Sequence, residues 1–168
     1  MAQTAPLTTT RYHCVDENAT AELTHLLAKA PELGNAVVWL HGDLGAGKTT
    51  WVRHLLRALG VQGRIKSPTY AIVEPHQTPA SPLFPTGLTV SHFDFYRFND
   101  PREWEDAGFR ELFAQPGLKL VEWPEKAADC LPPPDLDVTI ESMDNDERVF
   151  HLRAYSPCGY AILSTVAA

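Results

Sequence analysis

VVWLHGDLGAGKTTWVRHLL, residues 37–56, joins three patterns that belong together in one kind of local structure. The apolar run over 36–41 is typical of a strand buried on both faces of a sheet. The next residues, from Gly42 to Thr49, fit the pattern G-x-x-x-x-G-K-[ST] at every fixed position. Apolar residues at helical spacing then predict a helix over 48–59. Strand, glycine loop and helix in this order form the context in which the pattern makes a phosphate-binding loop.

The glycine-rich loop predicts a site for a nucleoside triphosphate. Glycines allow successive backbone N–H groups to curl around an anion, and the helix N-terminus adds the positive end of its dipole. Lys48 is placed to reach the β- and γ-phosphates, and the Thr49 hydroxyl is placed to bind Mg²⁺. An ordinary glycine turn between a strand and a helix is the alternative interpretation.

The composition is that of a globular chain with an acidic net charge. With 44% hydrophobic and 21% charged residues, the chain is typical of globular rather than disordered proteins. From its length of 168 residues we expect a single domain over 1–168. The net charge of -7 argues against a large nucleic-acid-binding face, but not against a partner protein that binds nucleic acid. Cys14, Cys130 and Cys158 have neither zinc spacing nor an even number, which favours a reducing cytoplasm. No membrane-spanning run or signal peptide is expected.

Periodicity and turn residues predict the remaining elements. A cap at Asp16 or Asn18 begins a helix that runs to about Ala30. The other expected elements are strands over 8–14, 70–74, 88–95 and 118–123, one or two helices over 101–113, a hairpin of 136–143 and 149–155, and a short C-terminal helix. Four prolines in 75–87 predict a surface connection. The fold class is therefore α/β: a partly parallel sheet flanked by helices, with a C-terminal antiparallel hairpin.

Two expected strands end in an acid, Asp94 and Glu122. Phosphate transfer needs a metal partner and a group that orients the nucleophile, and such groups lie at the carboxyl ends of strands in α/β sheets. Either acid fits the metal-binding role, and solvated loop acids are the alternative. Alternation along the strand is expected to place Phe93 and Phe95 on the face opposite the Asp94 carboxylate.

Four other residues lie within or beside these motifs. Thr69 is placed to contact the γ-phosphate or the metal shell, as a switch-loop threonine does, and a turn hydroxyl that caps the backbone is the alternative. Trp123 is expected in the core, and His41 and His92 are expected to be structural.

Five motifs in this order resemble the TsaE family, small bacterial P-loop ATPases of tRNA threonylcarbamoyladenosine biosynthesis. They are GDLGAGKTT at 42–50, KSPTYAIVE at 66–74, HFDFYR at 92–97, DPREWEDAGFRELF at 100–113 and LVEWPEKA at 120–127. The resemblance implies a P-loop NTPase-like fold and a Mg²⁺-dependent ATPase that is slow alone. It also implies TsaD and TsaB homologues as partners, with tRNA contacted only indirectly. In that scheme ATP hydrolysis allows the complex to turn over.

The resemblance also implies roles for individual residues. Asp94 is the catalytic or water-orienting acid, Thr69 lies in the switch-like loop, and Trp123 belongs to the active-site motif. Thr49 and Glu122 hold Mg²⁺. The residues implied to hold the nucleotide phosphates are Gly45, Ala46, Gly47, Lys48, Thr49 and Thr50. The proline-rich stretch 77–87 looks longer than the connection that the family usually has there.

Two other functions fit parts of the sequence. A small-molecule kinase would need arginines in a lid, for which Arg97, Arg102 and Arg110 are available, although the chain has little room for a lid domain. A GTPase-like switch is compatible with Thr69, but no N-K-x-D sequence for guanine selection occurs in the chain.

Overall fold

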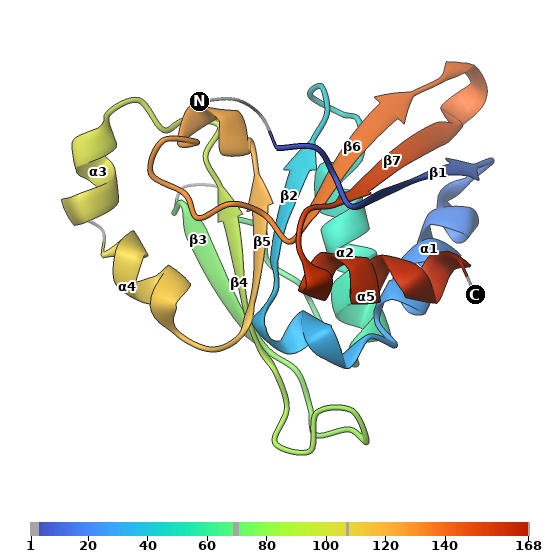
Figure 1. The fold of residues 1–168 in the computed structure, drawn as a ribbon, viewed down its shortest axis with the longest axis horizontal. Helices are drawn as coiled ribbons and strands as arrows, with labels where there is room; N and C mark the ends of the chain where they lie inside the picture. The colour runs from blue at the N-terminus through green and yellow to red at the C-terminus, as the bar shows by residue number, and fades with distance from the viewer. Residues whose placement is uncertain (1–3, 69–70, 107, 168) are drawn as a thin grey trace.

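The computed structural model describes residues 4–68, 71–106 and 108–167, which form one seven-stranded sheet in the order β1-β7-β6-β2-β5-β4-β3 (Figure 1). The strands are β1 (Thr8–Cys14), β2 (Val37–His41), β3 (Val73–Gln77), β4 (Thr89–Asp94), β5 (Leu118–Glu122), β6 (Leu136–Ser142) and β7 (Arg148–Ala154). Strands β6, β2, β5 and β4 are parallel, and β1, β7 and β3 are antiparallel to their neighbours. The predicted α/β class and the antiparallel β6–β7 hairpin are confirmed.

Helices cover both faces of this sheet. They are α1 (Glu17–Leu27), α2 (Lys48–Ala58), α3 (Pro101–Asp106), α4 (Phe109–Ala114) and α5 (Pro157–Ala167), with short 3-10 helices η1 (Pro31–Asn35), η2 (Pro124–Lys126) and η3 (Asp144–Asp146). Helices α1, α2 and α5 share one apolar core with the sheet, and α3 and α4 cover a smaller aromatic core on the other face near β4 and β5 (Figure 1). The sheet therefore separates two cores.

Several helix boundaries follow the predicted local signals. The Asp16 side chain caps α1 by accepting a hydrogen bond from the Ala19 N–H at 2.9 Å. Gly108, with φ of 68°, separates α3 from α4, so the segment over 101–113 forms two short helices. This conformation suits glycine because a Cβ would crowd the backbone there.

Two predictions about strands are wrong in detail. The strand expected over 70–74 runs instead over Val73–Gln77 and includes Pro75. Because β3 is an edge strand, it tolerates a proline that cannot donate to a ladder. The strand β2 is not buried equally on both faces, since Val38 and Leu40 are fully buried whereas Trp39 is only partly so.

The connection between β3 and β4 projects from the end of the sheet (Figure 1). The Thr78 backbone N–H donates to the Leu88 carbonyl at 2.9 Å, and the Leu88 N–H donates to the Thr78 hydroxyl at 2.8 Å. Within the connection, Phe84 packs against the larger core. The surface connection predicted over 75–87 is thus confirmed after Gln77, whereas 75–77 belong to β3, and hydrogen bonds close the connection at its base.

Candidate functional site

The glycine-rich loop leaves the carboxyl end of β2 and leads directly into α2. Gly45 and Gly47 have φ values of 79° and 109°, in the left-handed region that L-residues with a Cβ rarely adopt. Between them, Ala46 is 1% exposed and anchors the loop in the larger core. The loop and the first turn of α2 border a cavity of about 250 Å³, which we call the loop cavity. Its lining residues are Leu44, Gly45, Gly47, Lys48, Thr49, Thr50, Asp94, Tyr96, Glu122 and Trp123.

Lys48 is held inside this cavity by its own loop. Its Nζ atom donates to the carbonyls of Gly42 and Asp43, the latter at 2.9 Å. The same ammonium lies 4.3 Å from the centre of the Trp123 ring. Burial lowers the pKa of Lys48, an effect that nearby carboxylates, Glu122 foremost, oppose. The ammonium of a buried lysine at the N-terminus of a helix is suited to pair with a phosphate.

Glu122 faces the first hydroxyl of α2. The Thr49 hydroxyl donates to the Glu122 carboxylate, with Oγ1 lying 3.1 Å from both Oε1 and Oε2. The Glu122 side chain is only 3% exposed, and its Oε2 atom also lies 2.5 Å from His92 Nε2. Glu122 is buried because it ends β5, a strand whose five residues are all buried.

Asp94 occupies the matching position on the neighbouring strand. It is paired with Glu122 in the parallel β4–β5 register and lines the same cavity. Its Oδ1 atom accepts a hydrogen bond from the Tyr96 N–H at 3.0 Å. Burial raises the pKa of Asp94, and the neighbouring Glu122 carboxylate raises it further. The predicted alternation is confirmed, since Phe93 and Phe95 are fully buried in the aromatic core on the other face.

Trp123 is not simply a core residue. It has φ of 57°, a left-handed conformation that is unusual for a non-glycine residue. This bend turns the ring under Lys48 and within 5.0 Å of the Tyr96 ring, although Trp123 also packs against the aromatic core. The expected core packing of Trp123 is thus present, and the same side chain also lines the loop cavity.

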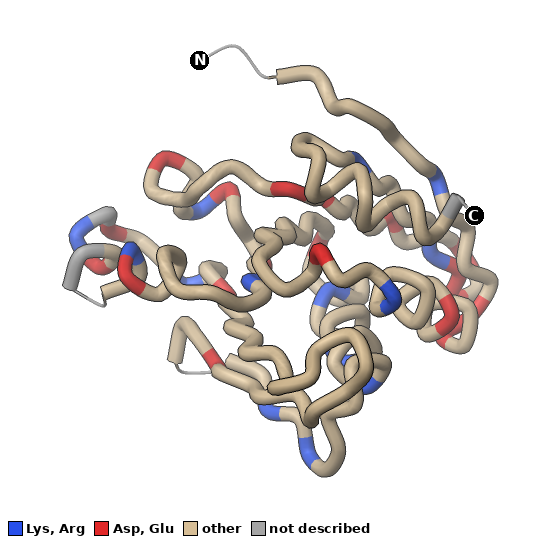
Figure 2. The backbone as a smooth tube through the Cα atoms, turned by 60° about the horizontal axis from the view of Figure 1, so that its bottom comes forward, with Lys and Arg blue, Asp and Glu red and all other residues tan. Residues whose placement is uncertain are grey.

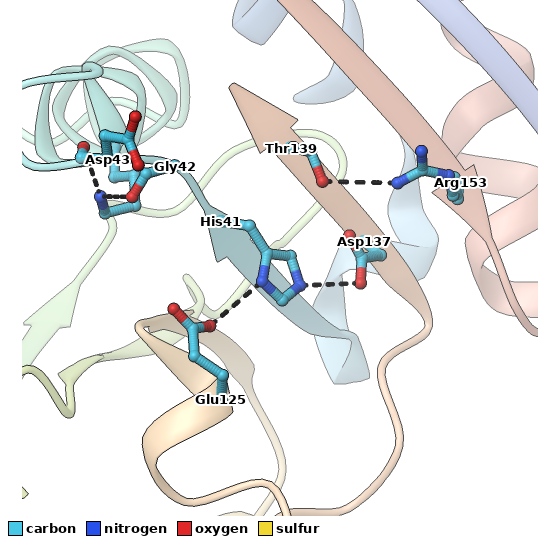
Figure 3. Close-up of polar contacts among 8 residues, drawn as sticks. His41, Gly42, Asp43, Glu125, Asp137, Thr139 and Arg153 are labelled. Carbon is cyan, nitrogen blue, oxygen red and sulfur yellow. Dashed lines mark hydrogen bonds and ion pairs between the residues drawn. The ribbon is translucent and has the colours of Figure 1, made fainter. Parts of the chain in front are cut away.

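The two histidines differ in their relation to the site. His92 contacts Glu122 and so reaches the site through it. His41, the residue before the loop, bridges two acids: its Nε2 lies 2.9 Å from Asp137 Oδ2 and its Nδ1 lies 3.2 Å from Glu125 Oε2 (Figure 3). His41 thereby ties the turn that carries Trp123 to the strand β6.

A second cavity, of about 420 Å³, adjoins the loop cavity and shares Gly45, Gly47 and Thr50 with it. We call it the side cavity. Its other walls are the start of α1 and the end of the β6–β7 hairpin, where Arg148 donates to the Ala46 carbonyl at 2.8 Å. Arg148 was not predicted, because no local pattern reveals a contact between residues 102 positions apart.

Thr69 lies outside the described residues, so its predicted place in a switch-like loop stays a prediction. All the other residues predicted for the site, except Ala46, line the loop cavity. Ala46 lines the side cavity instead and presents its carbonyl to Arg148.

The oxygen atoms of Thr49 and Glu122 fit a hard cation such as Mg²⁺, which prefers one or two carboxylates completed by phosphates and water. Within residues 4–68, 71–106 and 108–167, no group of three or more His, Cys, Asp or Glu side chains is arranged to hold a metal.

Charged residues of one sign are grouped along the chain: residues 44–73 carry five Lys or Arg and no acid, whereas residues 127–147 carry seven Asp or Glu and no Lys or Arg. Figure 2 shows blue Lys and Arg segments without red at the bottom of the view, and several red Asp and Glu segments at its right. Over the described part of the chain, no helix combines the length and apolarity needed to cross a membrane.

Comparisons with known proteins agree on one family. A family model described as "Threonylcarbamoyl adenosine biosynthesis protein TsaE" matches residues 14–150. The "tRNA threonylcarbamoyladenosine biosynthesis protein TsaE" of Haemophilus influenzae is 42% identical over 128 residues, 76% of each chain. The protein of the same name from Bacillus subtilis is 36% identical, covering 79% of this chain and 76% of the relative. The crystal structure of Bacillus subtilis YdiB superposes with a TM-score of 0.74 at 26% identity and covers 95% of both chains.

Proposed function

The chain belongs to the TsaE family of threonylcarbamoyl adenosine biosynthesis proteins, and we propose that it binds and hydrolyses ATP in support of that tRNA modification. One observation carries the proposal. The Thr49 hydroxyl and the buried Glu122 carboxylate face each other 3.1 Å apart at the start of α2, beside Lys48. A hydroxyl, a carboxylate and an ammonium at a helix N-terminus form the combination that magnesium and a triphosphate require together.

The phosphates of ATP are proposed to lie in the loop cavity. Backbone N–H groups of the loop and of the first turn of α2, over 45–50, surround the anion, and Lys48 turns from the Gly42 and Asp43 carbonyls to the β- and γ-phosphates. The residues present fit Mg²⁺, and Thr49 and Glu122 would hold it. Bound there, Mg²⁺ would neutralise charge that develops on the phosphate oxygens during transfer.

Asp94 is proposed to orient the attacking water. Its position opposite Glu122 places a second acid on the same cavity, while the Tyr96 N–H fixes its carboxylate. The raised pKa makes Asp94 a better proton acceptor than an ordinary aspartate, because a more basic carboxylate holds the water proton more strongly. Its role is therefore in the transition state rather than in ground-state binding.

The nucleoside half of ATP is proposed to occupy the side cavity. This cavity is continuous in its lining with the loop cavity through Gly45, Gly47 and Thr50. Phe150 offers an apolar wall, and Asp16 and Thr20 offer polar atoms. These groups give a nucleoside both an apolar surface and hydrogen-bonding partners.

ATP hydrolysis without group transfer is favoured over a kinase reaction. Of the arginines considered for a lid, Arg102 is 85% exposed and pairs with Asp100 at 3.1 Å. That pair lies at the start of the short helix α3 and not on the loop cavity. Incubation with labelled ATP and a panel of nucleosides tests this choice, since label on any acceptor would support a kinase.

The proposed partners are TsaD and TsaB homologues in the cytoplasm, with tRNA contacted through them. The net charge of -7 supports an indirect relation to tRNA, because a polyanion binds basic faces. The test is to mix the purified protein with its TsaD and TsaB homologues and measure co-elution with and without ATP. We expect the nucleotide to change the association, and no association in either state would count against the partner role.

A further inference from the structure

His92 is a buried histidine whose ring contacts the acid that faces Thr49. Its side chain is 1% exposed, and its Nε2 atom lies 2.5 Å from Glu122 Oε2. Because an ionised carboxylate only accepts hydrogen bonds, Nε2 is the donor. Among the described residues, the other ring nitrogen, Nδ1, is buried and finds no hydrogen-bond partner. The contact with Glu122 is thus the polar interaction that fixes the ring.

The strand β4 explains why this histidine lies behind the site. Alternation places Val90, His92 and Asp94 on one face of β4 and the aromatic residues on the other. Val90 joins the larger core, and Asp94 at the end of the strand lines the loop cavity. Both Asp94 and Glu122 line the loop cavity, whereas His92 is not among the described residues that line it. The histidine acts on the site through Glu122 and has no surface there of its own.

The contact restricts a side chain that otherwise has several rotamers. Glu122 Oε1 and Oε2 both face Thr49, and Oε2 is shared with His92. Burial of a carboxylate to this degree destabilises the folded state unless its oxygens accept hydrogen bonds. Removal of the histidine donor would leave the carboxylate free to rotate away from Thr49. The hydrogen bond therefore determines which way the oxygens of Glu122 point.

We propose that His92 is a positioning residue for magnesium, which holds the Glu122 carboxylate in the orientation that binds Mg²⁺ together with Thr49. The inference rests on the proposed function, since it concerns the metal used with ATP. Hydrogen-bond partners of metal-binding side chains typically change metal affinity by about 10-fold to 100-fold when they are removed. His92 needs no contact with ATP or with the metal to produce such an effect.

The test compares donors of different reach at position 92. His92→Leu removes the donor, whereas His92→Gln can place an amide N–H near the position of Nε2. For each variant, a fluorescent ATP analogue is titrated with Mg²⁺ and, separately, with EDTA. The dissociation constant in EDTA divided by the dissociation constant in Mg²⁺ defines the magnesium gain. We expect His92→Leu to lower this gain by about 10-fold to 100-fold with unchanged affinity in EDTA, and His92→Gln to keep most of it.

Two controls separate positioning from a general structural effect. Val90→Ala, on the same face of the same strand, removes core packing without touching Glu122, and it should lower the melting temperature but not the magnesium gain. In a Glu122→Gln background, His92→Leu should cause no further loss of gain, because the two residues act through one contact. A full additional loss in that background would overturn the proposal.

Should His92→Leu fail to fold, His92→Asn takes its place, because its amide is one bond too short to reach the position of Nε2. A lower gain in His92→Asn than in His92→Gln supports positioning, and equal gains overturn it. Equal weakening of binding with and without Mg²⁺ also overturns it. If the parent protein shows no magnesium gain at all, the proposed function fails; if the parent shows one that no His92 variant changes, the inference alone fails.

Discussion

Asp94 and Glu122 stand opposite each other in the parallel register of β4 and β5, at the ends of the strands that meet the glycine-rich loop. The two acids differ in their contacts: Glu122 is hydrogen-bonded to Thr49 and His92, whereas Asp94 accepts from the Tyr96 backbone. This difference is why we propose that Glu122 binds the metal and that Asp94 orients the attacking water. Each assignment can be tested by its own substitution.

Lys48→Ala is expected to abolish tight binding of ATP. Lys48 supplies a fixed positive charge in the loop cavity, where the residue is 5% exposed. Alanine keeps the helix, because it has the highest helix propensity, but offers the β- and γ-phosphates no charge. Titration of a fluorescent ATP analogue measures the loss, and circular dichroism checks the fold. Parent-like affinity in a folded Lys48→Ala protein would show that the loop does not hold the phosphates.

Glu122→Gln is expected to weaken binding of ATP in Mg²⁺ far more than binding in EDTA. The amide keeps the volume of the buried side chain and can still contact the Thr49 hydroxyl, but it lacks the charge that attracts the cation. Titrations with and without Mg²⁺ measure both affinities. An unchanged dependence on Mg²⁺ would transfer the metal-binding role to Asp94.

Asp94→Asn is expected to lower kcat while leaving nucleotide affinity within a few-fold of the parent. A residue that acts only in the transition state affects the rate and not the ground-state complex. Water-positioning or general-base help is worth about 100-fold in rate, or ~3 kcal/mol of barrier. A phosphate-release assay beside the binding titration separates the two effects. Equal losses of rate and affinity would contradict the assignment, and no loss of either would make Asp94 a structural acid.

Stability should depend on pH through His41. Burial lowers the pKa of His41, but the carboxylates of Asp137 and Glu125 outweigh it and raise the pKa above its ordinary value. The protonated ring of His41 therefore adds to the free energy of unfolding. This contribution is fully present below the unfolded-state pKa near 6.5 and is lost as the pH rises through the folded-state pKa. Because His41 and its two acids are partly exposed, their interaction contributes about 1 kcal/mol or less to the free energy of unfolding.

The measurement for His41 is urea unfolding of the parent and of His41→Gln across pH 5 to 9. The difference in unfolding free energy between the two proteins should shrink as the pH rises, which isolates His41 from the other histidines. A constant difference over this range would show that His41 is not protonated between the two acids.

Local patterns in the sequence were sufficient for most of the fold. The order of strand, glycine loop and helix over 36–59 specified β2 and α2, and the alternation around Asp94 gave the correct facing of Phe93 and Phe95. The predicted position of β3 is wrong because the prolines of 75–87 predict a surface connection there, although an edge strand tolerates Pro75.

The contacts that complete the site join residues far apart in the chain. His92 meets Glu122 across 30 positions, and Arg148 meets Ala46 across 102. Periodicity reports which face of an element a residue occupies, but not which residue of another element it meets there. For His92 a signal existed: it shares the face of β4 that Asp94 presents to the site.

Release of inorganic phosphate from ATP tests the central claim most directly. The parent protein is assayed with Mg²⁺, alone and together with its TsaD and TsaB homologues, and Asp94→Asn is assayed beside it under both conditions. We expect slow release by the parent alone, faster release with the partners, and about 100-fold less from Asp94→Asn in each case. Release no faster than the protein-free blank, with and without the partners, would contradict the account of this chain as an ATPase.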